Sequence, residues 1–176
     1  MAALGVAGGR AQGLSEAAPA PKTVNVAPTN GIATADVFKD QSMAPSKAID
    51  GDPSTMWNAG SRGTATHPHF LIVKLRRPLR VGAISLKDIV WKPGGPFLGF
   101  DNIYNLYIGS DGVSYTKIAS GTLTESRDPK WNSALVPVPK RLSTLQYVKY
   151  EVVGGSHWAH LMEMEILVSQ DLHPRR

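Results

Sequence analysis

Residues 103–118 read IYNLYIGSDGVSYTKI, and this stretch has the pattern of a β-hairpin. The segment 103–108 alternates in the way expected of a half-buried strand. Ser110, Asp111 and Gly112 then give a tight-turn signal, and residues 114–118 return to the β-branched and aromatic composition of a strand. We therefore expect two antiparallel strands joined by a short turn.

Short apolar segments of the same kind recur along the chain. They are rich in β-branched or aromatic residues and lie at 70–75, 81–86, 133–138, 147–153 and 162–168. A turn is expected at Arg77-Pro78, directly after the first of them. Since no window of twelve residues shows sustained helical periodicity, the pattern predicts an all-β fold, either a sandwich or a jelly roll.

The composition suits a single domain of this type. Of the 176 residues, 42% are hydrophobic, which is enough for a sizeable core, and the 17 glycines and 13 prolines favour a turn-rich fold. The chain has no cysteine, so disulfides, thiolate metal sites and cysteine nucleophiles are excluded. No apolar run reaches the roughly 18 residues that a membrane-spanning helix needs.

The two end segments differ in composition from the rest. Residues 1–23 are mainly Ala, Gly and Pro, and they lack the basic start and continuous apolar stretch of a signal peptide. We expect a flexible arm or linker there, or a peptide that docks on a partner. The globular domain is then expected at 24–169, with a polar tail at 170–176.

The net charge of +5 at pH 7 would suit an anionic partner, but the positive residues are scattered. The densest group is Lys74, Arg76, Arg77 and Arg80, which alternate with apolar residues. Specific nucleic-acid binding is therefore not expected.

Four stretches, in order along the chain, resemble one known family. They are Asn25–Ala27 with Gly31–Ala35, Ala48–Trp57 (AIDGDPSTMW), Tyr107–Gly112, and Tyr147–Lys149 with Leu161–Ile166. The family is the discoidin, or coagulation factor type C, family, which includes the family 32 carbohydrate-binding modules. The resemblance covers residues 24–169 and implies an eight-stranded antiparallel jelly-roll β-sandwich. One departure is Lys74-Leu75-Arg76, where the family usually has Asp-Leu-Gly.

The segment Asp50-Gly51-Asp52 is a candidate cation site. Calcium prefers six to eight oxygen ligands, and a tight loop presents carbonyl groups beside carboxylates. The alternative is an ordinary Asp-Gly turn with capping hydrogen bonds. The resemblance implies a structural calcium held by the Lys47 and Asp52 carbonyls, the Asp50 carboxylate, a hydroxyl from Thr55 or Ser61, and Glu163. Such an ion would fix the loops without taking part in chemistry.

The segment 91–100, WKPGGPFLGF, is a candidate binding loop because it holds three aromatic residues without strand alternation. In similar proteins, loops at one rim of the fold bind ligands, and aromatic faces can stack on sugar rings. We expect contacts from Trp91, Lys92, Phe97 and Asn102. Two alternatives are that the aromatics cap the end of the sandwich, or that Trp91, Phe97 and Leu98 insert into a membrane.

The segment 154–160, GGSHWAH, is the last loop before the closing strand. The resemblance makes His157 and Trp158 a second candidate wall of the binding site. The alternative is that Trp158 packs inward and His160 caps a strand. Trp57 is expected in the core, and Trp131 in either the core or the rim. In the family, the residues that bind galactose include an arginine. The corresponding stretch of this chain is Lys87-Asp88, which offers no equivalent arginine.

A catalytic role is not expected. Signatures of serine hydrolases, phosphate-binding glycine loops and HExxH sequences are absent, and ordinary surface histidines are favoured over a zinc site. The sequence therefore predicts a ligand-binding module, most readily for glycans, in an extracellular or surface-exposed setting, within a larger host protein or assembly. One alternative is a structural, decoration or adhesion protein of a surface assembly such as a virion, with the arm as the attachment. A less favoured alternative is a phospholipid-binding module.

Overall fold

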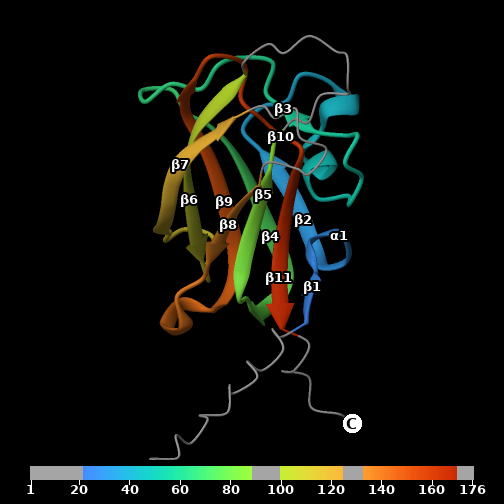
Figure 1. Ribbon diagram of the computed structural model, residues 1–176, viewed down its shortest axis with the longest axis vertical. Helices are drawn as coiled ribbons and strands as arrows, with labels where there is room; N and C mark the ends of the chain where they lie inside the picture. Colours follow the sequence, from blue (N-terminus) through green and yellow to red (C-terminus); the bar gives the residue numbers. More distant parts are fainter. Residues whose placement is uncertain (1–21, 89–99, 125–132, 170–176) are drawn as a thin grey trace, which may run out of the picture.

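The computed structural model describes residues 22–88, 100–124 and 133–169. These residues form two antiparallel sheets packed face to face, with the four-stranded sheet toward the viewer in Figure 1. Several expectations concern segments outside the described residues. They are those for the arm (apart from Lys22 and Thr23), for the tail, for Trp131, and for the loop holding Trp91, Lys92 and Phe97. No helix in the described segments is long and apolar enough to cross a membrane.

The sheets have simple antiparallel pairings. The four-stranded sheet has the order β1 (Thr23–Asn25), β11 (Glu163–Ser169), β5 (Ala83–Lys87), β8 (Ser133–Pro137). The five-stranded sheet has the order β2 (Gly31–Ala35), β4 (His69–Arg80), β9 (Thr144–Gly155), β6 (Asp101–Gly109), β7 (Thr116–Thr124). A short pair joins β3 (Trp57–Asn58) to β10 (His160–Leu161), and the helical turns are α1 (Ala27–Asn30), η1 (Gln41–Met43), η2 (Pro45–Ala48) and η3 (Lys140–Leu142). The predicted all-β antiparallel sandwich is confirmed, and these sheets accommodate the eight expected strands.

The hairpin predicted at 103–118 is formed by β6 and β7, which pair from Asp101↔Thr124 to Ile108↔Thr116. Its turn is stabilised locally, because Asp111 Oδ1 accepts the backbone N–H groups of Val113 at 2.9 Å and Ser114 at 2.8 Å. Gly112 has a φ of 78°, a left-handed conformation that glycine adopts without a steric penalty.

The turn expected at Arg77-Pro78 is not a strand end. Strand β4 continues to Arg80, and its pairing with β9 changes register between Lys74 and Leu79. Proline has no N–H to donate to a neighbouring strand, so a regular ladder cannot pass through Pro78. The proline signal therefore marks an irregularity inside the strand.

The core lies between the two sheets. Alternate residues of the strands point inward and are fully buried, including Leu71, Val73, Ile84, Leu86, Leu106, Val148 and Ile166. Trp57 is also fully buried, as expected. Its Nε1 donates to the Val37 carbonyl at 3.0 Å, and its ring meets Tyr150 edge-on at 6.5 Å between centroids.

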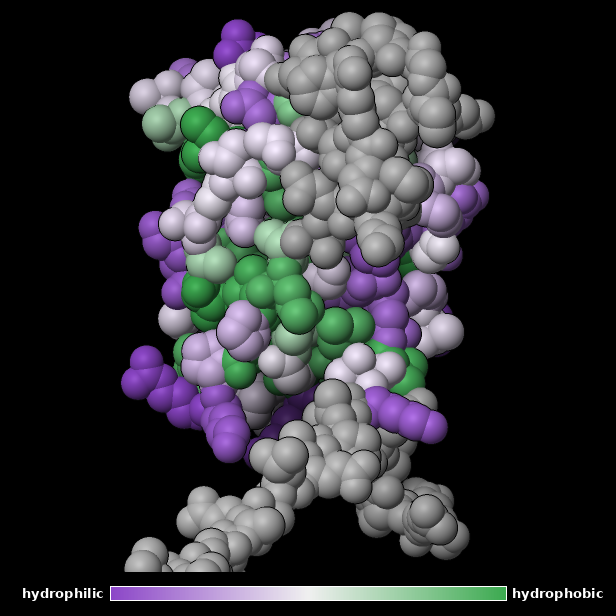
Figure 2. Space-filling model, in the orientation of Figure 1, coloured by the Kyte–Doolittle hydropathy of each residue, from purple (hydrophilic) through white to green (hydrophobic). Residues whose placement is uncertain are grey.

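The outer face of the four-stranded sheet carries an apolar area, visible as the green region in Figure 2. Leu135 is 64% exposed and points outward from β8. The register places Pro137, Ala83 and Leu167 side by side on the same face. We call these four residues the outer apolar face.

One end of the sandwich carries β3, β10 and the loops beside them, at the top of Figure 1. The first described strand begins, and the last ends, at the opposite end. The loops 59–63 and 156–159 lie together at the end with β3 and β10, since the Ala159 N–H donates to the Ser61 carbonyl. The loop 47–55 lies against the start of β11, where Gly51 meets Glu163, and beside Pro28 of α1.

Candidate metal site and aromatic rim

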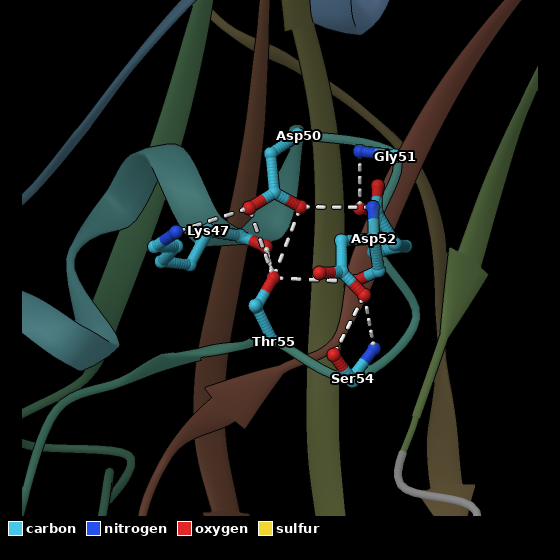
Figure 3. A network of polar contacts seen from close by, with 7 residues as sticks. Lys47, Asp50, Gly51, Asp52, Ser54 and Thr55 are labelled. Atoms are coloured by element: carbon cyan, nitrogen blue, oxygen red, sulfur yellow. Dashed lines mark hydrogen bonds and ion pairs between the residues drawn. The ribbon is translucent and has the colours of Figure 1, made fainter.

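Three of the residues expected to hold calcium, Lys47, Asp50 and Asp52, converge on the hydroxyl of Thr55 (Figure 3). Thr55 Oγ1 lies 3.1 Å from the Lys47 carbonyl, 3.0 Å from each carboxylate oxygen of Asp50, and 3.2 Å from the Asp52 carbonyl. A hydroxyl has one proton and can donate to one acceptor at a time. Other donors also reach these oxygens: the Asp52 N–H lies 3.0 Å from Asp50 Oδ1, Lys47 Nζ lies 3.4 Å from Asp50 Oδ2, and the Thr55 N–H lies 3.2 Å from the Asp52 carbonyl. The loop thus has the capping hydrogen bonds of an Asp-Gly turn, and it gathers four oxygens around one hydroxyl where a cation could be coordinated.

Glu163 reaches the same loop from β11. Its Oε1 accepts the Gly51 N–H at 2.7 Å, while its buried Oε2 has no hydrogen-bond partner among the described residues. Burial raises the pKa of Glu163 to about 8, and the nearby Asp50 carboxylate contributes to the same direction of shift. Without a cation, this carboxyl group is held mostly protonated at neutral pH.

The donor set fits calcium better than zinc. No three His, Cys, Asp or Glu side chains of the described segments are grouped to hold a metal ion. At Thr55 the Asp50 carboxylate instead lies beside carbonyl and hydroxyl oxygens, and Glu163 reaches the same loop at Gly51; oxygen donors of these kinds are the chemistry of calcium. If an ion is bound here, Lys47, Asp50, Asp52, Thr55 and Glu163 would hold it.

Ser61 lies elsewhere. Its hydroxyl is 2.8 Å from His69 Nε2, and its carbonyl accepts the Ala159 N–H at 2.9 Å. Of the two hydroxyls considered for the cation site, the structure therefore brings Thr55 to Asp50.

An aromatic group lies at the same end of the domain. His157 stacks on Phe100 with ring centroids 3.8 Å apart and contacts Trp158 at 5.2 Å. Trp158 is 36% exposed, and Lys39 Nζ lies 5.1 Å from the centroid of its ring. We call Lys39, Phe100, His157 and Trp158 the aromatic rim. The inward-packed alternative for Trp158 does not match this exposure.

Burial lowers the pKa of His157, and the nearby His160 and Arg62 act in the same direction. The imidazole is therefore mainly neutral at pH 7 and carries one donor and one acceptor nitrogen. This pairing suits hydroxyl groups, which also donate and accept.

Asn102 lies beneath the rim. Its side chain is fully buried, and Nδ2 lies 3.0 Å from Nδ1 of the equally buried His160. The two ring nitrogens of His160 also contact the Trp158 carbonyl at 2.7 Å and Asp88 Oδ1 at 2.7 Å. The expectation that Asn102 contacts a ligand directly is therefore corrected: it belongs to a buried polar group under the loop.

Sequence reasoning did not identify two positively charged residues near the aromatic rim, Lys39 and Arg62. The Arg62 guanidinium donates to the Gly155 carbonyl, which ties the loop after β3 to the end of β9. Neither residue lies in a motif that marks a site. Their proximity to the rim comes from contacts between segments far apart in sequence.

The chain belongs to the F5/8 type C domain family, whose model matches residues 32–166. This is the family expected from the four matching stretches. A comparison with curated proteins finds no match.

Solved structures of carbohydrate-binding modules share the fold. The family 32 module of NanJ from Clostridium perfringens, in complex with galactose, is 20% identical with a TM-score of 0.61, over 84% of this chain and 100% of that one. A second module from this organism, CpGH89CBM32-5, in complex with GalNAc-β-1,3-galactose, is 19% identical with a TM-score of 0.63, over 81% and 99%. The module of AlyQ, in complex with 4,5-unsaturated mannuronic acid, is 22% identical with a TM-score of 0.56, over 77% and 92%.

Proposed function

We propose that this domain is a carbohydrate-binding module that holds a glycan against the aromatic rim, a role that needs no covalent chemistry. The observation that carries the proposal is the exposed indole of Trp158 beside His157 and Phe100. An exposed aromatic face stacks on the C–H face of a pyranose ring, while adjacent polar groups hydrogen-bond its hydroxyls. The solved modules of the same fold, with their sugar ligands, support this ligand class.

A contact of one or two sugars would be weak. Small polar interfaces of this kind give dissociation constants from about 1 μM to 1 mM, which corresponds to roughly −8 to −4 kcal/mol. Modules with such affinity gain effective strength through repeats, oligomers or attachment to a larger protein. The proposal therefore includes a larger host protein or assembly, in an extracellular or surface-exposed setting, with residues 1–23 as the connection.

The proposal also includes a structural calcium at Lys47, Asp50, Asp52, Thr55 and Glu163. The ion would be coordinated by the Lys47 carbonyl, the Asp50 carboxylate and the Asp52 carbonyl, which gather around the Thr55 hydroxyl. It would also give the buried Oε2 of Glu163 a partner. Its role would be to fix the loop 47–55 against β11.

A second candidate is a structural or adhesion protein of a surface assembly such as a virion. The outer apolar face favours it, because contiguous exposed apolar residues mark contact surfaces in soluble proteins. The phospholipid-binding version depends on Trp91, Phe97 and Leu98, which lie outside the described residues.

The test is binding of the purified full chain to a glycan array, with calcium and with chelator. We expect binding that Trp158→Ala reduces at least about fivefold, since stacking contacts of this type contribute on the order of 1 kcal/mol or more. Val113→Ala, at an 84% exposed position in the β6–β7 turn, is the matched control and should bind as the wild type does. Folded protein that binds no glycan would refute the proposal and leave the assembly role as the better explanation.

A further inference from the structure

Three polar side chains from separate segments form one hydrogen-bonded series. Asp36 directly follows β2, Ser61 lies in the loop after β3, and His69 is the first residue of β4. Ser61 Oγ is 2.8 Å from His69 Nε2, and His69 Nδ1 is 2.7 Å from Asp36 Oδ2. This is the order of atoms found in serine hydrolases: hydroxyl, Nε2, Nδ1, carboxylate.

The carboxylate is held in place for this role. Asp36 Oδ1 accepts the Phe70 N–H at 2.8 Å, which leaves Oδ2 to face His69. A carboxylate at Nδ1 keeps the proton on that nitrogen and leaves Nε2 as the acceptor. Nε2 can then take the proton of the Ser61 hydroxyl, which turns a weak nucleophile into an active one.

Ser61 is accessible and lies on a fixed loop. The residue is exposed, its carbonyl accepts the Ala159 N–H, and Gly60 before it has a φ of 75°. The backbone N–H of Arg62, the residue after the nucleophile, donates to no group within 22–88, 100–124 and 133–169. An N–H in this position can stabilise the oxyanion of a tetrahedral intermediate.

The series lies beside the aromatic rim. The Ala159 N–H that bonds to Ser61 belongs to the residue after Trp158. On the other side, Gly60 packs against Lys39, where a Cβ on the glycine would lie 3.2 Å from Lys39 Cβ. Ser61 therefore lies between the chain neighbours of two rim residues, Trp158 and Lys39, and Lys39 Nζ in turn lies 5.1 Å from the centroid of the Trp158 ring.

We propose that Ser61, His69 and Asp36 form a catalytic triad that hydrolyses acyl esters, and that the substrates are O-acylated sugars bound at the aromatic rim. The substrate class rests on the proposed glycan binding, whereas the triad rests on its own geometry. This adds an activity that sequence motifs did not predict, because the three residues meet only in the folded chain.

The reaction has two steps. Ser61 Oγ attacks the ester carbonyl carbon as its proton passes to His69 Nε2; the bond to the sugar oxygen then breaks, and that oxygen takes the proton from His69. This leaves an acyl group on Ser61. A water molecule gives a proton to His69 as its oxygen attacks the acyl carbon, and the carboxylic acid leaves as Ser61 regains its proton.

The test is covalent labelling of the full chain with a fluorophosphonate probe, located by peptide mass spectrometry. We expect modification at Ser61, no modification of that position in Ser61→Ala, and labelling at least about 100-fold slower in Asp36→Asn, which keeps an acceptor for the Phe70 N–H. Ser110→Ala, at an exposed serine in the β6–β7 turn, is the control and should label as the wild type does. Ser61 that reacts no faster than other serines in the folded protein would overturn the triad.

The substrate class is tested separately by release of acetate from an O-acetylated oligosaccharide. Release by the wild type and not by Ser61→Ala supports it. Labelling at Ser61 without glycan binding would overturn sugar esters as the substrate while the triad stands. Glycan binding without labelling would overturn the triad while the proposed function stands.

Discussion

Replacing Glu163 with glutamine should change stability in opposite directions in chelator and in calcium. In the absence of a cation, the folded state holds the Glu163 proton with a pKa of about 8, against an ordinary value of 4.5. The folded protein therefore binds one more proton than the unfolded chain between these values, and stability falls as the pH rises through this window. A glutamine side chain at this position has no such proton, so the substitution removes this dependence.

The size follows from the two pKa values. Between pH 5 and pH 7.5, the shift corresponds to a loss of about 3 kcal/mol in the free energy of unfolding of the wild type. In chelator, Glu163→Gln should match the wild type at pH 5 and exceed it at pH 7.5, by roughly 6–12 °C in Tm for a domain of this size. In calcium at 1,000 times Kd the order at pH 7.5 should reverse, because binding there adds about 4.1 kcal/mol to the wild type alone.

The assay is thermal or urea unfolding at both pH values, with chelator and with calcium. Glu165→Gln is the control, because its side chain pairs with Lys87 at 2.6 Å and lies outside the proposed site. Glu165→Gln should change the stability in the same direction in chelator and in calcium. If Glu163→Gln is less stable than the wild type at pH 7.5 in chelator, the buried proton is refuted. If calcium stabilises both proteins equally, the metal site is refuted.

Three further predictions concern unfolding of the domain itself. Gly112→Ala should cost about 1–3 kcal/mol because alanine is strained at a φ of 78°, whereas Gly82→Ala, without that constraint, should change the denaturant midpoint much less. Trp57→Phe should cost about 2 kcal/mol or more in urea unfolding, since it leaves a cavity and the Val37 carbonyl without its donor; an unchanged midpoint would contradict this packing. Asn102→Ala should lower Tm by several degrees, because the side chain is buried, while Trp158 fluorescence still reports a folded rim. A variant that loses glycan binding at an unchanged Tm would instead favour direct contact between Asn102 and the ligand.

The strand pattern was accessible from sequence because it depends on local periodicity. Alternation at 103–108 and the Asp111-Gly112 turn define the β6–β7 hairpin without reference to the rest of the chain. The same reasoning failed at Pro78, where a local turn signal lies inside β4. A neighbouring strand holds the chain extended there, and a local pattern does not report its neighbours.

In the candidate sites, too, the sequence predicted features local to one segment and did not predict contacts between distant segments. The motif at 48–57 placed Asp50, Asp52 and Thr55 in one loop, because residues so close in sequence cannot be far apart. It could not show that Asn102 is buried or that Lys39 lies over Trp158. Burial depends on how the loops cover the end of the sandwich.

By itself, the sequence determined the all-β class, the hairpin and the acidic loop, since each follows from patterns local to short segments of the chain. The tertiary structure alone decided which distant groups meet. Glu163 reaches Gly51 across 112 residues, and Asp36, Ser61 and His69 meet from three separate segments. These contacts depend on strand order and register, which many sequence segments fix together when the two sheets bury a common core.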